Sequence, residues 1–214
     1  MSIERHALPG LFITFEGCEG AGKSTQVSRA MEWLTGQGIP VLVTREPGGT
    51  SLGSGLRSLL LDPDVACIPL SEMFILLADR AQHVAEIIVP ALREWRVVLC
   101  DRYNDSTLAY QAWGGGLDLE SARRCCEIAT TGLEPDLTIL LDMDPAASLG
   151  RLSRSFDRME QKGLEFHARV RQGFLELARQ SAERIRVIDA QADVDTVSEA
   201  VQAAIQSAMR ERGM

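Results

Sequence analysis

The chain has 214 residues, of which 45% are hydrophobic and 24% are charged, values that are ordinary for one soluble globular domain. The net charge of −8 excludes a general affinity for nucleic acid or for an anionic membrane, so any anion must be bound locally. We expect a protein of the reducing cytoplasm, because the five cysteines are an odd number without metal-ligand spacing. The N-terminus lacks the features of a signal peptide, and the apolar runs are too short to span a bilayer, so no membrane partner is expected.

Short apolar runs alternate with segments of helical spacing along the chain. The runs are rich in branched side chains, as is typical of strands buried on both faces, and cover residues 11–16, 40–46, 96–101, 136–142 and 184–189. The helical segments cover residues 23–36, 71–92, 119–131, 164–182 and 193–210. The alternation predicts a single α/β domain over residues 1–214, with three α/β/α layers around a five-stranded, mostly parallel sheet. Ligands are expected beyond the carboxyl ends of the strands, at residues 17–25, 45–50 and 101–111.

The stretch GCEGAGKST, residues 17–25, follows the first predicted strand and opens the first predicted helix. Its outer glycines and its Lys-Ser pair match the phosphate-loop pattern G-x-x-x-x-G-K-S/T, and the strand and helix stand where that pattern requires them. In such a loop backbone N–H groups turn toward a phosphate, the lysine reaches the outer phosphates, and the serine hydroxyl ligates Mg²⁺. We predict an ATP site formed by Gly17, Cys18, Glu19, Gly20, Ala21, Gly22, Lys23, Ser24 and Thr25.

Two carboxylates lie near this predicted site. A carboxylate such as Glu19, inside the loop, is electrostatically costly beside a triphosphate unless it serves another group, and a hydroxyl of a second substrate is the natural partner. The alternative is that Glu19 faces water. Asp101 closes the third predicted strand, where a second acidic residue commonly completes the Mg²⁺ shell, and its alternative is an ordinary turn residue. We assign the predicted metal site to Ser24 and Asp101.

Three arginines are expected at the same edge of the sheet. Arg45 lies in TREPGGT after the second strand, Arg80 in the apolar helix that contains ADRAQH, and Arg102 in DRYNDSTLAYQ after the third strand. Guanidinium groups bind phosphate oxygens through paired hydrogen bonds and neutralise charge during phosphoryl transfer, so this convergence favours a second phosphorylated substrate. The alternative is that Arg80 and Arg102 pair with acidic neighbours on their own segments.

Residues 151–163, RLSRSFDRMEQKG, break the alternating pattern and are interpreted as a mobile insertion. Arg151, Arg154 and Arg158 are spaced by three and four, so on a helix they would share one face. We expect that face to close as a short lid over the ATP phosphates and to exclude water. A solvated basic stripe is the alternative.

Together these motifs resemble those of the bacterial thymidylate kinases. The resemblance is carried by FEGCEGAGKST, TREPGGT, ADRAQH, DRYNDSTLAYQ, PDLTILLD, DRME and RVRQGFLELA, which span nearly the whole chain. It implies a P-loop NTPase fold, a homodimer, and transfer of the γ-phosphate of ATP to dTMP in dTTP biosynthesis, giving dTDP and ADP.

The same resemblance implies roles for individual residues. Glu19 would contact the 3′-hydroxyl side of the deoxyribose, while Arg80 and Arg102 would hold the dTMP phosphate or base. Tyr110 would crowd the 2′ position and so disfavour ribose. The residues that would line the thymine pocket are Ser106 and Gln111.

Three departures from the family pattern bear on rate and specificity. Leu76 stands where the family commonly has a Phe that stacks on thymine, and Phe74 is two residues away, so we expect looser base recognition. Gly115 replaces an Arg that makes a phosphate or dimer contact, and the lid is short with few basic residues. Gly20 stands where some relatives have a basic loop residue, which implies that Arg154 takes that role. The expected catalytic residues are Glu19, Lys23, Arg102 and Arg154.

Other functions stay open at this stage. A kinase for another nucleoside monophosphate or a deoxynucleoside, such as dUMP, dGMP or deoxycytidine, is compatible with Leu76. A GTP-dependent switch is disfavoured because the chain has no N-K-x-D or D-x-x-G motif. A dinucleotide-binding oxidoreductase is disfavoured because G-x-G-x-x-G does not occur.

Overall fold

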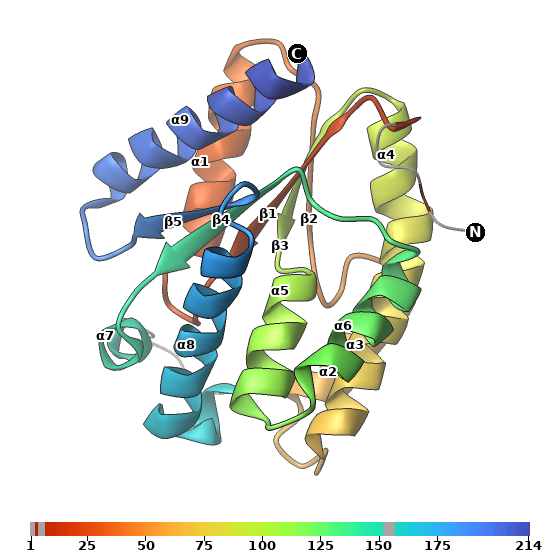
Figure 1. Ribbon diagram of the computed structural model, residues 1–214, viewed down its shortest axis with the longest axis vertical. Coiled ribbons are helices and arrows are strands. Elements are labelled where there is room, and N and C mark those ends of the chain that lie inside the picture. Colours follow the sequence, from red (N-terminus) through yellow and green to blue (C-terminus); the bar gives the residue numbers. More distant parts are fainter. Residues whose placement is uncertain (1–2, 4–6, 152–156) are drawn as a thin grey trace.

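A computed structural model of the protein describes residue 3 and residues 7–151 and 157–214. Five strands form one sheet in the order β2-β3-β1-β4-β5, and all of their pairings are parallel (Figure 1). The strands are β1 (Leu11–Glu16), β2 (Val41–Arg45), β3 (Val97–Asp101), β4 (Leu137–Asp142) and β5 (Ile185–Asp189). Every residue of the central strand β1 is buried, whereas the edge strands β2 and β5 are partly exposed. The predicted five-stranded sheet is confirmed.

Helices cover both faces of this sheet, because successive side chains of each buried strand point to opposite sides. On one face α1 (Lys23–Gly36) and α9 (Val194–Arg212) pack against alternate residues of β1, β3 and β4. On the other face η2 (Val84–Ile88) and α4 (Val89–Arg93) pack against β1 and β3, and α8 (Leu164–Gln180) packs against β4 and β5. Next to α8 on this side, α3 (Pro69–His83) and α6 (Leu119–Thr130) share its apolar cluster (Figure 1). The remaining segments are α2 (Ser51–Leu61), α5 (Asn104–Thr107), η3 (Leu108–Gly114), α7 (Pro145–Gly150) and η4 (Glu160–Lys162). The three predicted layers are therefore confirmed.

The helix predicted over residues 71–92 is divided into three consecutive segments. A π-helical turn, η2, separates α3 from α4, and the Val89 N–H donates to the Val84 carbonyl across it. Pro90 has no N–H to donate, and its ring would crowd the carbonyl of Glu86 in a regular α-helix. The wider π turn relieves this conflict.

Helix α2 was not predicted, because two glycines and several small residues obscure its helical pattern in the sequence. The Thr50 side chain caps α2 by accepting from the Gly53 N–H at 2.9 Å. Gly53 also lets α2 pack closely on α3, since a Cβ there would lie 2.0 Å from Asp79 Oδ1. Among the helices in the described ranges, none has both the length and the apolar character needed to cross a membrane.

Candidate active site

A cavity of about 510 Å³ opens at the carboxyl ends of β1, β2 and β3. Most of the predicted site residues line it: Glu19, Gly20, Gly22, Lys23, Ser24, Thr25, Arg45, Leu76, Arg80, Asp101, Arg102, Ser106, Tyr110 and Gln111. Gly17, Cys18 and Ala21 belong to the loop but are not among the lining residues. Arg154 lies outside the described residues. The topology thus brings together segments that are up to about 90 residues apart in the sequence.

The loop between β1 and α1 requires glycine at positions where the backbone is both left-handed and crowded. Gly17 has a φ of +136°, and a Cβ there would lie 2.4 Å from the carbonyl oxygen of Leu141. Gly20 has a φ of +76°, and a Cβ there would lie 2.0 Å from the carbonyl oxygen of Ser148. The loop in this conformation therefore excludes the basic side chain that some relatives have at the position of Gly20.

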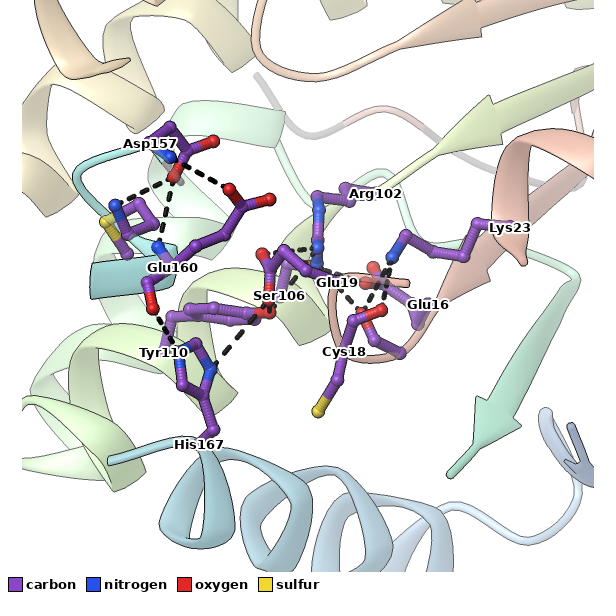
Figure 2. Close-up of polar contacts among 12 residues, drawn as sticks. Glu16, Cys18, Glu19, Lys23, Arg102, Ser106, Tyr110, Asp157, Glu160 and His167 are labelled. Carbon is purple, nitrogen blue, oxygen red and sulfur yellow. Dashed lines mark hydrogen bonds and ion pairs between the residues drawn. The ribbon is translucent and has the colours of Figure 1, made fainter. Parts of the chain in front are cut away.

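Lys23 is held inside this loop by main-chain oxygens. Its Nζ donates to the carbonyls of Gly17 and Cys18, each at 2.9 Å (Figure 2). Burial, and then the positive charge of Arg102, lower the pKa of Lys23. Burial, and then the carboxylate of Glu19, raise the pKa of Cys18 to about 11. The Cys18 thiol is therefore protonated at neutral pH, which disfavours oxidation inside the loop.

The alternative in which Glu19 faces water is wrong, because its side chain is only 16% exposed. Arg102 Nη2 donates to its Oε1 at 2.8 Å, and the Tyr110 hydroxyl donates to its Oε2 at 2.5 Å (Figure 2). His167, which the sequence analysis did not single out, has its Nδ1 3.9 Å from the same Oε2. Burial alone would raise the pKa of Glu19, but the positive charges of Arg102 and Lys23 lower it. The result is an ionised hydrogen-bond acceptor that is fixed in place.

A second carboxylate, Glu16, is linked to Arg102 through Ser106. It was not predicted as a site residue from the sequence. Arg102 Nη1 donates to Ser106 Oγ at 2.9 Å, and Ser106 Oγ donates in turn to Glu16 Oε2 at 2.5 Å. The Tyr103 N–H donates to Glu16 Oε1 at 2.8 Å. Burial, and then the negative charge of Asp105, raise the pKa of Glu16 to about 7. The available signal in the sequence is a carboxylate at the end of an otherwise apolar strand.

Arg80 is not on a solvated helix face, since it is 1% exposed. Its Nε donates to Glu46 Oε2 at 2.6 Å, its Nη1 to Thr107 Oγ1 at 2.9 Å, and its Nη2 to the Tyr103 carbonyl at 3.0 Å. These bonds fix the guanidinium in one orientation in the cavity wall. The role of Arg80 toward a substrate stays a prediction.

Arg57, on α2, lines the cavity together with Arg45 and Arg102. Its Nη1 donates to the Pro47 carbonyl at 2.9 Å. Burial, and then the positive charges of Arg45 and Arg102, lower the pKa of Arg57. The guanidinium groups of Arg45, Arg57 and Arg102 thus line one cavity and repel one another. An anion bound between them would offset this repulsion, so the arrangement favours an anionic ligand.

The predicted arginine face of the lid needs correction. Arg158 Nε donates to the Leu60 carbonyl at 2.9 Å, and its Nη1 pairs with Glu72 Oε1 at 2.7 Å. Lys162 Nζ bonds both oxygens of the same carboxylate, at 2.8 and 2.9 Å. The prediction that Arg158 faces the donor phosphates is therefore wrong, because the buried carboxylate of Glu72 draws the segment toward α3. Arg151, at the end of α7, does line the cavity.

Leu76 is the apolar side chain of α3 that lines the cavity, whereas Phe74 is exposed and is not among the lining residues. Phe74 therefore does not replace the stacking ring of the family. Gln111 is 1% exposed, and its Nε2 donates to Glu72 Oε2 at 3.3 Å. At Gly115 a Cβ would lie 2.7 Å from the Gln111 carbonyl oxygen, so the local packing excludes a side chain there.

Ser24 and Asp101 lie next to each other beside the loop. Ser24 Oγ donates to Asp101 Oδ2 at 3.3 Å. Asp101 Oδ1 is buried and has no hydrogen-bond partner within the part of the chain that the structure describes. A buried carboxylate oxygen without a partner beside a serine hydroxyl fits the oxygen ligands that Mg²⁺ takes, either directly or through water.

Comparisons with known proteins agree with this geometry. The family model described as thymidylate kinase matches residues 15–201. A thymidylate kinase of Carboxydothermus hydrogenoformans is 50% identical over 182 residues, covering 84% of this chain and 89% of that relative. One of Bifidobacterium longum is 51% identical over 210 residues, covering 95% and 99%.

A solved structure is similar as well. The crystal structure of thymidylate kinase from Ehrlichia chaffeensis superposes with a TM-score of 0.77 at 33% identity, covering 92% of this chain and 99% of that one. The family model spans most of the chain, and the relatives align over nearly their whole length. The chain therefore belongs to the thymidylate kinase family, whose members are nucleoside monophosphate kinases.

Proposed function

We propose that this protein transfers the γ-phosphate of ATP to dTMP, giving dTDP and ADP. The observation that carries the proposal is the Glu19 carboxylate, which is ionised and held by Arg102 and Tyr110 at the border between the phosphate loop and the rest of the cavity. A protein that only hydrolysed ATP would gain nothing from such a group, whereas a kinase uses it to orient a sugar hydroxyl. A kinase for another nucleotide or nucleoside is the alternative, which the acceptor panel described in the Discussion tests.

In this proposal the donor and the acceptor occupy the two ends of one cavity. The triphosphate binds the main-chain N–H groups of the phosphate loop, and Lys23 follows the transferring phosphoryl group. The acceptor phosphate binds between Arg45, Arg57 and Arg102, whose mutual repulsion it relieves. Thymine packs on Leu76 with Gln111 at its edge. Phosphoryl transfer then needs little covalent chemistry from the protein beyond positioning and charge neutralisation.

We also propose Mg²⁺ as a cofactor, held by Ser24 and Asp101. The buried Asp101 Oδ1 and the adjacent serine hydroxyl support this assignment. Bound Mg²⁺ would neutralise charge on the β- and γ-phosphates. Turnover measured against free Mg²⁺ after treatment with EDTA tests the proposal, and full activity without the ion would contradict it.

Tyr110 is proposed to exclude ribose. The side chain is buried against Phe166 and Phe174, and its hydroxyl is fixed on Glu19, so it has no room to move away from a 2′-hydroxyl. Tyr110→Ala should narrow the preference for deoxy over ribo acceptors by about tenfold or more, since it opens space beside the sugar. The measurement is kcat/KM for dTMP and for its ribo counterpart, with Tyr110→Phe as the control that keeps the ring. An unchanged ratio in Tyr110→Ala would remove Tyr110 from the specificity assignment.

A homodimer is proposed from the exposed apolar side chains of α2 and α3. Leu52 and Leu59 are seven residues apart on α2, and Leu70 and Phe74 are four apart on α3, so each pair shares a helix face. A second copy would remove this apolar surface from water. Phe74→Glu is expected to convert a dimer into monomers in sedimentation velocity. A wild-type protein that sediments at the 23.4 kDa monomer mass at micromolar concentration would contradict the proposal.

A cytoplasmic location is proposed as well. All five cysteines are free thiols, the form that a reducing compartment maintains. Fractionation of cells that express the chain tests this, and recovery outside the cytosolic fraction would contradict it.

A further inference from the structure

The backbone conformation of Arg102 is unusual for its residue type. Its φ is +74°, in the left-handed region that favours glycine. The residue follows β3 directly, and its N–H donates to the carbonyl of Phe15 on β1 at 3.0 Å. A non-glycine residue keeps this conformation only where its surroundings impose it, and such residues concentrate at functional sites.

Glu16, the last residue of β1, holds the backbone of Arg102 in this conformation through the turn that follows it. The carboxylate accepts from the Tyr103 N–H at 2.8 Å and from Ser106 Oγ at 2.5 Å, so its two oxygens join both ends of the turn that follows Arg102. The side chain is 0% exposed. In the described ranges, no Lys, Arg or His nitrogen lies within 4.0 Å of it.

A buried carboxylate without an ion pair works against stability. Asp105 on α5 does not neutralise Glu16, because it repels the carboxylate and is itself paired with Arg184 at 2.8 Å. Arg102 attracts Glu16, but Ser106 stands between them. A costly buried carboxylate that bonds Ser106, which in turn accepts from the cavity-lining guanidinium of Arg102, indicates a role in activity.

Glu16 also sets the direction of the hydrogen bond that Arg102 makes. Because the Ser106 hydroxyl donates its proton to Glu16, its lone pairs face Arg102 Nη1, which donates to them at 2.9 Å. The second terminal nitrogen of Arg102, Nη2, is then directed at Glu19 and donates to its Oε1 at 2.8 Å. A neutral amide in place of Glu16 would offer a donor to Ser106, reverse the hydroxyl, and point its proton at the guanidinium.

We propose that Glu16 is a positioning residue for phosphoryl transfer, which holds the turn after β3 and orients Ser106 so that Arg102 faces the acceptor phosphate. This inference rests on the proposed role of Arg102. It assigns to Glu16 an action through Ser106 and the backbone, with no contact of its own to either substrate.

The test is Glu16→Gln, which keeps the size of the side chain, assayed at pH 8, where the wild-type carboxylate is ionised because its pKa is about 7. Turnover with dTMP is expected to fall about 10- to 100-fold, with KM for ATP unchanged. The melting temperature should stay equal or rise, because the burial of an unpaired charge is removed. Thr14→Val on the same strand is the matched control; it breaks the 2.8 Å Thr14–Thr138 bond and should leave turnover unchanged.

A double-mutant cycle with Arg102→Ala separates positioning from general damage. If Glu16 acts through Arg102, Glu16→Gln should have little further effect in the Arg102→Ala background. The proposal would be overturned if the losses of turnover in the two single variants multiplied in the double variant. It would also be overturned if Glu16→Gln had a lower melting temperature but normal turnover. Should Glu16→Gln fail to fold, Ser106→Ala enters the same cycle with the same two outcomes. Normal turnover of Arg102→Ala alone would instead contradict the proposed role of Arg102.

Discussion

Lys23→Ala is expected to lower kcat by about 10²- to 10³-fold or more while the fold remains intact. In the structure the ammonium of Lys23 is buried and held by the carbonyls of Gly17 and Cys18, so it is positioned before any substrate arrives. Because this charge is proposed to follow the phosphoryl group as it moves, its removal should affect the transition state more than ATP binding. Steady-state turnover and the melting temperature of the variant measure the two effects separately.

Arg29→Ala is the matched control for Lys23→Ala, since Arg29 lies on the same helix, α1, and pairs with Asp195 at the surface. Turnover of this control should equal that of the wild type, because exposed ion pairs contribute little. Near-normal activity of Lys23→Ala would exclude the phosphate loop from the mechanism.

Arg102→Ala is expected to have an effect of similar size, about 10²- to 10³-fold on kcat/KM for dTMP. The Arg102 guanidinium donates to both Glu19 and Ser106. Its Cζ also lies over the Tyr110 ring, 5.1 Å from the ring centroid. Its loss removes the proposed ligand of the acceptor phosphate and also releases Glu19, the carboxylate proposed to orient the sugar.

Loss of Arg102 should also change the pH dependence. In the wild type burial raises the pKa of Glu19, and the positive charge of Arg102 is the largest of the influences that lower it. Without the guanidinium the pKa of Glu19 rises, so the Glu19 carboxylate becomes protonated at a higher pH. As the pH is lowered, KM for dTMP should therefore begin to increase at a higher pH than in the wild type. Arg124→Ala, which breaks the exposed pair with Glu120, is the control and should change neither quantity. A pH profile identical to that of the wild type would contradict the proposed Glu19–Arg102 unit.

Local patterns in the sequence were sufficient for the sheet and the phosphate loop. The strands are recognisable because both faces of each central strand are buried, so the apolar residues run without a break. The loop is recognisable because its glycines meet a steric demand that other residues fail, as Gly17 and Gly20 show. Arg45 and Arg102 are placed at one edge of the sheet by the topology rule for parallel sheets, because they stand at the carboxyl ends of β2 and β3.

Contacts between distant segments were not predictable in the same way. The pairing of Glu72 with Arg158 joins residues 86 positions apart, and no periodicity connects them. Arg57 was missed because α2 has an irregular pattern. Glu16 looks like an ordinary strand end until the turn after β3 is seen folded over it. Such groups depend on tertiary packing, which a single sequence does not reveal.

The dTMP kinase activity proposed for this protein is tested by measuring the release of ADP from Mg-ATP with dTMP, dUMP, UMP, dCMP, dGMP and deoxythymidine offered one at a time, against a blank without acceptor. We expect a clear preference for dTMP, slow turnover of UMP because Tyr110 is proposed to crowd the 2′ position, and release in the blank near background. Such a result would leave Leu76 to provide the apolar contact that an aromatic ring provides in the family. Faster release with another acceptor, or equal release with none, would contradict the assignment of dTMP as the substrate.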